Sequence, residues 1–215
     1  MKKESIKILQ WNADGINPKI HELADFLSSH EIDIAMIQES KLTAKQQTPV
    51  IEGYAAERSD RQDAKFPGGG LITYVHHSLP LKTIGRAMHG NVEAQSISII
   101  DSPKTCLNLI NLYIPPKADS TDISWLSIND RTLIAGDLNG HSPCGRTSDN
   151  HTTDSMGEQI EDLMAQRNLS CLNTGEATHV NRATGNGNTP DITLVTQDLS
   201  NHQEWQVMDY GGHGV

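Results

Sequence analysis

The sequence has few aromatic residues and few cysteines. Aromatic residues make up 4% of the 215 positions, so the core has to be built mainly from aliphatic side chains. The three cysteines, Cys106, Cys144 and Cys171, are odd in number and far apart in the sequence. This spacing fits neither a disulfide framework nor a zinc-binding pattern. We therefore expect free thiols at all three positions.

Long apolar runs and a surplus of basic residues are missing as well. No stretch approaches the roughly 20 apolar residues that cross a membrane as a helix, and the first ten residues are charged rather than signal-like. The net charge of −10 argues against a simple basic DNA-binding module. An acidic protein can still bind a polyanion when a divalent metal ion supplies local positive charge.

The length of 215 residues suits one domain with a substantial core, and we treat residues 1–215 as a single domain. Apolar patterning predicts strands that are interrupted by two main helices, which is typical of two packed sheets with helices outside them. The expected strands are 6–12, 33–40, 68–76, 94–100, 106–114, 131–139, 190–196 and 205–210, and the expected helices are 18–30 and 155–168.

Polar residues recur where the apolar strands stop, and functional sites are commonly built from such positions on a rigid sheet. A single one of these residues is usually a turn former or a cap. The whole set, in chain order, favours a site, although spacing alone leaves both interpretations open. The set consists of Asn12, Glu39, Tyr113, Asp137, Asn139, Asp191 and His213.

Six short motifs then make the sequence recognisable. In order, "LQWNADGI", "MIQES", "NLYIPP", "AGDLNGH", "PDITLV" and the terminal histidine resemble those of the endonuclease/exonuclease/phosphatase superfamily, which includes deoxyribonuclease I and apurinic/apyrimidinic endonucleases. The closer resemblance is to the endonuclease domain of LINE-type non-LTR retrotransposons. It is carried by "GGGLITYV", "DLNGHSPCG", "NLSCLNTGEATHV" and "TPDITLV". Each motif alone is weak, whereas the ordered set is specific.

The resemblance implies a deoxyribonuclease I-like fold: a four-layered α/β sandwich of two packed, mostly antiparallel sheets flanked by helices. It implies an enzyme that nicks DNA with Mg²⁺, or with Mn²⁺ as an alternative. Glu39 would be the main metal ligand, and Asn12 would position Glu39 or the metal-bound waters. Oxygen ligands suit Mg²⁺, which keeps several of its waters.

The resemblance also assigns the remaining roles. Asp137 would orient or deprotonate the attacking water, and Asn139 would contact the phosphate or the metal. Tyr113 would donate its phenol to the phosphate, while His213, paired with Asp191, would stabilise the transition state. DNA contacts are expected from Lys41, Arg182 and His141, and from the basic segment 58–65.

The last motif departs from the family pattern. Where the family has Ser-Asp-His, this sequence has Gly211-Gly212-His213, so the carboxylate at position 212 is missing. We expect reduced activity, which Gly212→Asp should raise, because Asp209 is a poor geometric substitute. Only two residues follow His213, which suggests a domain excised from a larger polypeptide that would continue towards a reverse transcriptase.

The function implied by the resemblance is nicking of double-stranded target DNA in the nucleus. The resulting 3′-hydroxyl would prime reverse transcription of the element's RNA by the reverse transcriptase of the same polypeptide, without any membrane partner. Two alternatives stay open: an abasic-site repair endonuclease, and a catalytically weakened DNA-targeting module. Inositol phosphate hydrolysis is disfavoured because no basic cluster follows "GDLN".

Overall fold

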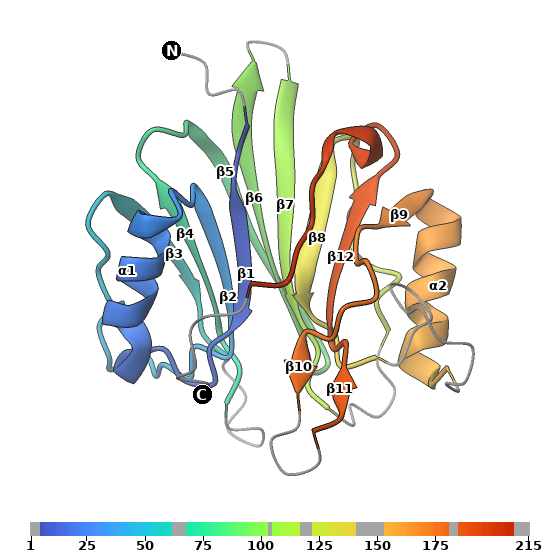
Figure 1. Cartoon of the computed structure of the whole chain (residues 1–215), viewed down its shortest axis with the longest axis horizontal. Helices are drawn as coiled ribbons and strands as arrows, with labels where there is room; N and C mark the ends of the chain where they lie inside the picture. Colours follow the sequence, from blue (N-terminus) through green and yellow to red (C-terminus); the bar gives the residue numbers. More distant parts are fainter. Residues whose placement is uncertain are drawn as a thin grey trace.

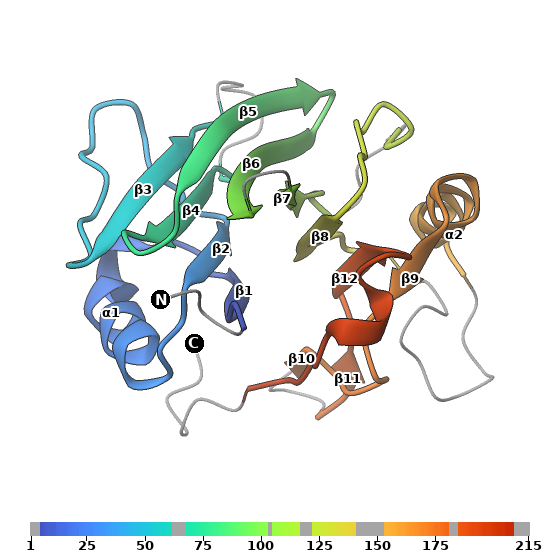
Figure 2. The same cartoon turned by 90° about the horizontal axis from the view of Figure 1, so that it is seen from above.

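Two β-sheets lie face to face, with one long helix outside each sheet (Figures 1 and 2). The computed structural model describes residues 5–61, 68–102, 105–116, 122–140, 153–180 and 185–208. The order of layers is helix, sheet, sheet, helix, so the predicted four-layered α/β sandwich is confirmed.

The first sheet has four strands in the order β1-β2-β4-β3. β1 and β2 are parallel, and the other pairs are antiparallel. The chain passes from β1 to β2 through a 3-10 turn that contains Pro18 and then through α1. The elements are β1 (Ile8–Asn12), η1 (Asn17–Lys19), α1 (Ile20–Ser29), β2 (Ile34–Gln38), β3 (Tyr54–Ser59) and β4 (Leu71–His76).

The second sheet has six strands in the order β5-β6-β7-β8-β12-β9. Only β7 and β8 are parallel neighbours in it. Its elements are β5 (Leu81–His89), β6 (Val92–Ser102), β7 (Thr105–Tyr113), β8 (Thr132–Asp137), α2 (Ser155–Arg167), β9 (Leu169–Cys171), β12 (Asp191–Thr196) and, after it, η2 (Ser200–His202). A separate two-stranded hairpin, β10 (His179–Val180) with β11 (Gly187–Asn188), precedes β12.

Alternation along the strands divides the core into three apolar layers. On β2, Ala35 and Ile37 pack towards α1, whereas Ile34 and Met36 pack into the space between the sheets. The far face of the second sheet packs against Ile160 and Leu163 of α2. α2 begins at a regular cap, because the Asp154 carboxylate accepts a hydrogen bond from the Gly157 amide at 2.8 Å.

Several sequence-based expectations were incomplete or wrong. The pattern missed β3 and β5, whose polar residues obscure the alternation. The expected strand at 205–210 is wrong over its described part, 205–208, where no strand forms. β12, the preceding strand, already pairs with β8 and β9 on its two sides, so the chain that follows cannot pair with it. Residues 209 and 210 lie outside the described ranges.

The cysteine expectation also needs correction. Cys106 is a free, half-buried thiol, but Cys171 is disulfide-bonded. Distance along the sequence did not reveal this, because a disulfide depends on proximity in space. Among the described residues, no helix is long and apolar enough to cross a lipid bilayer.

Candidate active site

A row of polar side chains crosses the second sheet at one level. The strand register pairs Tyr113 with Asp137 and Asp137 with Asp191. It also pairs Tyr113 with Glu93 on the other side. Directly paired residues point to the same face of a sheet. Glu93, Tyr113, Asp137 and Asp191 therefore form one row on four neighbouring strands, facing the first sheet.

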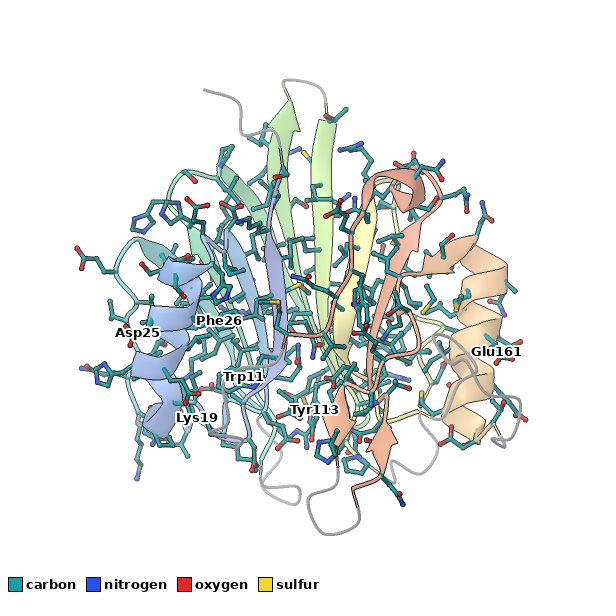
Figure 3. The ribbon with its side chains drawn as sticks, viewed as in Figure 1. Trp11, Lys19, Asp25, Phe26, Tyr113 and Glu161 are labelled. Atoms are coloured by element: carbon teal, nitrogen blue, oxygen red, sulfur yellow. The ribbon has the colours of Figure 1, made fainter. Side chains whose placement is uncertain are left out.

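Polarity along these strands changes in steps towards the row. At one end the inner face is apolar, with Leu109, Leu133 and Val195 between the sheets. Next comes a layer of neutral polar residues that includes Gln95 and Asn111. The charged row follows at the end where Tyr113 lies, the end from which β10 and β11 project (Figures 1 and 3).

The first sheet supplies Asn12, at the end of β1, and Glu39, just after β2. The amide nitrogen of Asn12 donates to Glu39 Oε1 at 3.0 Å and to Asp137 Oδ2 at 2.7 Å. The Tyr113 hydroxyl donates to the same Glu39 oxygen at 2.9 Å. Strand ends that are far apart in the sequence thus meet at a single group of hydrogen bonds that joins both sheets.

The carboxyl group of Asp137 has a pKa well above its ordinary value. Its residue is only 6% exposed. Burial and, after it, the neighbouring Asp191 raise its pKa to about 7, although the hydrogen bond from Asn12 opposes the shift. A carboxyl group with such a pKa can exchange a proton near neutral pH, as a general base requires.

Two residues that were predicted to act with Asp137, Asn139 and Tyr113, have different surroundings. The backbone amide of Asn139 donates to Asp137 Oδ1 at 3.2 Å, while its side-chain amide donates to the Ile114 carbonyl at 3.0 Å. Asn139 therefore holds the loop around Asp137, with its side-chain amide bonded to the backbone. Burial, followed by the nearby Glu39, raises the pKa of Tyr113 strongly, so its phenol stays neutral and remains a hydrogen-bond donor.

Asp191 is held by groups on opposite sides. Gln10 Nε2 donates to its Oδ1 at 2.8 Å, and its own backbone amide donates to Thr178 Oγ1 at 3.3 Å. Burial raises the pKa of Asp191, and the bond from Gln10 opposes that shift. Its proposed partner His213 lies outside the described residues.

A chain of neutral amides lies directly behind the row and was not predicted. Gln10 Nε2 donates to Gln38 at 2.7 Å, and Gln38 Nε2 donates to Asn111 at 2.6 Å. Asn111 continues to Thr73 at 3.3 Å, and Thr73 donates to Gln95 at 2.6 Å. This amide layer, from Gln10 to Gln95, ties the two sheets together and orients the nitrogen of Gln10 towards Asp191.

Lys41 places a positive charge beside Glu39. Its ammonium group lies 3.2 Å from Glu39 Oε2 and also contacts the Asp14 carboxylate. The hydrogen bond that Lys41 donates to Asp14 raises the pKa of Lys41, and the same contact lowers the pKa of Asp14. Asp14, which belongs to "LQWNADGI", was missed. The two carboxylates form a position where a cation is held, with the oxygen donors that Mg²⁺ prefers.

The described residues contain no group of three or more histidine, cysteine, aspartate or glutamate side chains arranged around one metal position. A site with one or two carboxylates is compatible with an ion that keeps most of its waters. Mg²⁺ is commonly bound in this way.

The basic segment 58–65 does not provide the expected free cations in its described part. Arg58 belongs to β3, and its guanidinium donates to Asp60 at 2.8 Å and to the Thr43 carbonyl at 2.6 Å. Arg61 is buried in an ion pair with Glu93. Both charges are used inside the protein, so they are unavailable to phosphate. Residues 62–65 lie outside the described ranges.

A two-stranded hairpin lies just before Asp191. β10 and β11 pair antiparallel, and Thr178, at the base of this hairpin, accepts the bond from the Asp191 amide. The loop at its tip, with Arg182, lies outside the described residues. The same is true of His141, Asp209 and Gly212.

The family model described as "Endonuclease-reverse transcriptase" matches residues 107–212. The probable RNA-directed DNA polymerase from transposon X-element of Drosophila melanogaster is 26% identical over 181 residues, which are 80% of this chain and 19% of that protein. The RNA-directed DNA polymerase from mobile element jockey of the same organism is 23% identical over 188 residues, 83% of this chain and 19% of that protein. The chain thus spans about a fifth of these relatives.

Solved structures share the fold. The endonuclease domain of TRAS1, a telomere-specific non-LTR retrotransposon, has a TM-score of 0.66 at 18% identity, covering 94% of this chain and 90% of that one. The AP endonuclease LMAP from Leishmania major has a TM-score of 0.68 at 17% identity, with 92% and 80% covered. The resemblance drawn from the motifs is confirmed, and the comparisons support a DNA endonuclease.

Proposed function

We propose that this chain, which carries a domain of the endonuclease-reverse transcriptase family, is a metal-dependent endonuclease that nicks double-stranded DNA. One observation carries the proposal: Asn12 bridges Glu39 and Asp137 while Tyr113 donates to Glu39. A carboxylate for a metal ion, a carboxyl group with a pKa near neutrality and a neutral phenol are thereby gathered at one point.

Each group has a role in phosphodiester hydrolysis. Asp137, with a pKa of about 7, would accept a proton from the attacking water and orient it. Asn12 keeps the carboxylates of Asp137 and Glu39 apart and in place. Tyr113 would donate its hydroxyl to a phosphate oxygen. Asp191 would hold the imidazole of His213 at the scissile phosphate.

Glu39 would hold Mg²⁺ or Mn²⁺. The carboxylate of Asp14, which contacts the same Lys41 ammonium group, would add a second oxygen donor. When bound, the ion supplies positive charge to the phosphate and to the departing 3′ oxygen. Lys41 would then be released towards the DNA backbone, where phosphate contacts provide salt-sensitive affinity.

The biological role that fits this site is priming. A nick with a 3′-hydroxyl would start reverse transcription of the element's RNA by a reverse transcriptase in the same polypeptide, acting in the nucleus. Support comes from the two Drosophila relatives, which are named as RNA-directed DNA polymerases of mobile elements.

Conversion of supercoiled plasmid to open circle tests this function. With Mg²⁺ the parent protein should nick the plasmid, and with EDTA it should not, because Glu39 alone supplies no positive charge to the phosphate. Asp137→Ala and His213→Ala should each lose activity. The matched control is Asp162→Ala, an exposed acid on α2, which should nick at the parental rate.

Duplexes with and without an abasic site separate the proposed function from its alternatives. Equal cutting of both supports a target-nicking enzyme, whereas cutting confined to the abasic duplex would favour repair. DNA binding without metal-dependent nicking would identify a targeting module instead.

The β10–β11 hairpin is expected to bias target choice. It adjoins Asp191 through Thr178 but forms its own two-stranded sheet, so it can reach a DNA groove without altering the catalytic row. Replacing 181–186 by a loop of equal length should keep the nicking rate within about threefold and change the distribution of nicks. Mapping nicks on a labelled duplex measures this.

Replacement of the exposed turn 43–46 serves as the control for the hairpin, and its nick pattern should match that of the parent protein. An unchanged pattern in an active hairpin variant would refute the role of the hairpin.

A further inference from the structure

We propose that the buried ion pair of Arg61 and Glu93 positions Glu39 and Tyr113, acting through the glycine triplet Gly68–Gly70. The inference rests on the proposed function for the roles of Glu39 and Tyr113. Arg61 and Glu93 are positioning residues here, because they contact the proposed catalytic groups rather than the substrate.

The ion pair is among the most buried charge contacts of the described residues. The Arg61 and Glu93 side chains are 6% and 4% exposed, and Arg61 Nη2 lies 2.5 Å from Glu93 Oε1. The same guanidinium donates to the Asn91 carbonyl at 3.2 Å. Replacing a buried pair of this kind by apolar residues is often neutral or stabilising, so its presence is weak evidence of a role in stability. A role in geometry is the alternative that the surrounding contacts support.

The glycine triplet is shaped around this pair. All three residues have positive φ values, +106°, +70° and +86°, which favour glycine. A Cβ atom on Gly69 would overlap the Glu93 carboxylate and approach the Arg61 guanidinium, and one on Gly70 would lie 2.5 Å from Ser40 Oγ. The Gly70 amide donates to Glu93 Oε2 at 2.9 Å. The motif "GGG" therefore has a spatial explanation: the backbone must pass between Glu93 and the segment after β2.

The triplet then holds the backbone on both sides of Ser40. Ser40 N donates to the Gly70 carbonyl at 3.0 Å, and Lys41 N donates to the Gly69 carbonyl at 2.9 Å. Glu39 and Lys41 both have left-handed conformations, with φ values of 47° and 51°. Such conformations cost about 1–3 kcal/mol for residues other than glycine and persist only where surrounding structure imposes them. The contact with Gly69 and Gly70 is that structure.

The ion pair also reaches Tyr113 directly. Arg61 Cζ lies 5.4 Å from the centre of the Tyr113 ring, within the range of a cation–π contact. Glu93 is the cross-strand neighbour of Tyr113. The Tyr113 hydroxyl donates to the Glu39 carboxylate. The buried pair of Arg61 and Glu93 thus helps to hold both of these groups in place.

The inference is tested by measuring Mn²⁺ affinity by calorimetry in the absence of DNA. The parent protein is compared with the variants Arg61→Lys and Glu93→Gln. Loss of groups that orient metal ligands typically weakens affinity or activity by about 10- to 100-fold, so we expect Mn²⁺ affinity to fall by about tenfold or more. The nicking kcat should fall with it, while the KM for DNA stays within about twofold and excess Mn²⁺ restores part of the rate. The control pair is Arg86→Lys and Glu57→Gln, which breaks a partly exposed contact of 3.6 Å.

Near-UV circular dichroism checks that each variant is folded. Should a single variant fail to fold, the double variant Arg61→Gln/Glu93→Gln removes both charges together and takes its place. Mn²⁺ affinity that stays at the parental value in folded pair variants would overturn the inference. A parent protein that binds Mn²⁺ but nicks no DNA would instead overturn the proposed function, and the shift in Mn²⁺ affinity would still decide the role of the pair.

Discussion

Replacing Asp137 by asparagine is expected to abolish nicking and to stabilise the fold at neutral pH. Loss of a general base costs about 10²- to 10⁴-fold in rate. The gain in stability follows from burial, which raises the pKa of Asp137 to about 7 from an unfolded value near 3.9. Between about pH 4 and pH 7 the folded state binds more protons than the unfolded state, so the free energy of unfolding decreases as pH rises. Asparagine does not titrate, so it avoids this loss.

The measurement is the free energy of unfolding in EDTA at pH 5 and pH 8. The parent protein should be less stable at pH 8 than at pH 5, and Asp137→Asn should exceed the parent at pH 8 by a few kcal/mol. Asp162→Asn, on the exposed face of α2, should leave both values unchanged. If Asp137→Asn is no more stable than the parent at pH 8, burial does not strain the charged form of this carboxyl group.

Gly136→Ala is expected to destabilise the protein severely. A Cβ atom at this position would overlap the carbonyl oxygen of Leu112 and crowd its amide, because β7 and β8 approach closely just before Asp137. This neighbour is backbone, which cannot rotate away as a side chain does. The strands would have to separate, at a cost of about 3 kcal/mol or more. The urea midpoint of unfolding measures the effect.

The control is Gly85, a strand glycine whose nearest neighbour is a side chain that can rotate. A Cβ atom on Gly85 would approach the Ser96 hydroxyl at 2.5 Å, and that hydroxyl can turn aside. Gly85→Ala should therefore stay within about 1 kcal/mol of the parent protein. Equal urea midpoints for Gly136→Ala and the parent would show that β7 and β8 have more room than their contact implies.

The group of hydrogen-bonded side chains at the candidate site could be predicted from the sequence as far as strand ends can be recognised. Asn12, Glu39, Tyr113 and Asp137 all stand where an apolar run stops, and the structure brings these four together. A glycine in a strand is also a signal of close backbone approach, and Gly136 of "GDLN" is crowded by the Leu112 backbone beside Asp137. Local patterning carried this information because the strands themselves are rigid and regular.

The remaining features depend on pairing between distant strands, which no local pattern encodes. Glu93, the second residue of β6, follows a turn and carries no local sign of a site; only the strand register places it beside Tyr113. Gln10 lies at an inward position of β1. The reason for a polar residue there is its hydrogen bonds to Gln38 and Asp191, which are distant in the sequence. Arg58 looked like a surface cation because one of its partners, the Thr43 carbonyl, lies 15 positions away in the sequence. The sequence of β12 likewise does not show that β8 and β9 pair with both of its edges.

The amide layer has a consequence for how the chain becomes a nuclease during its synthesis. The bond from Gln10 to Asp191 joins residues 181 positions apart, and the bond from Gln38 to Asn111 joins residues 73 positions apart. Contacts of such separation form late, because the intervening chain has to be ordered first. A growing polypeptide therefore lacks the bonds from Gln10 to Asp191 and from Gln38 to Asn111 until β12 and β7 have left the ribosome. Cutting activity is thereby delayed until nearly all of this domain has been made, so an unfinished product of translation carries no working nuclease.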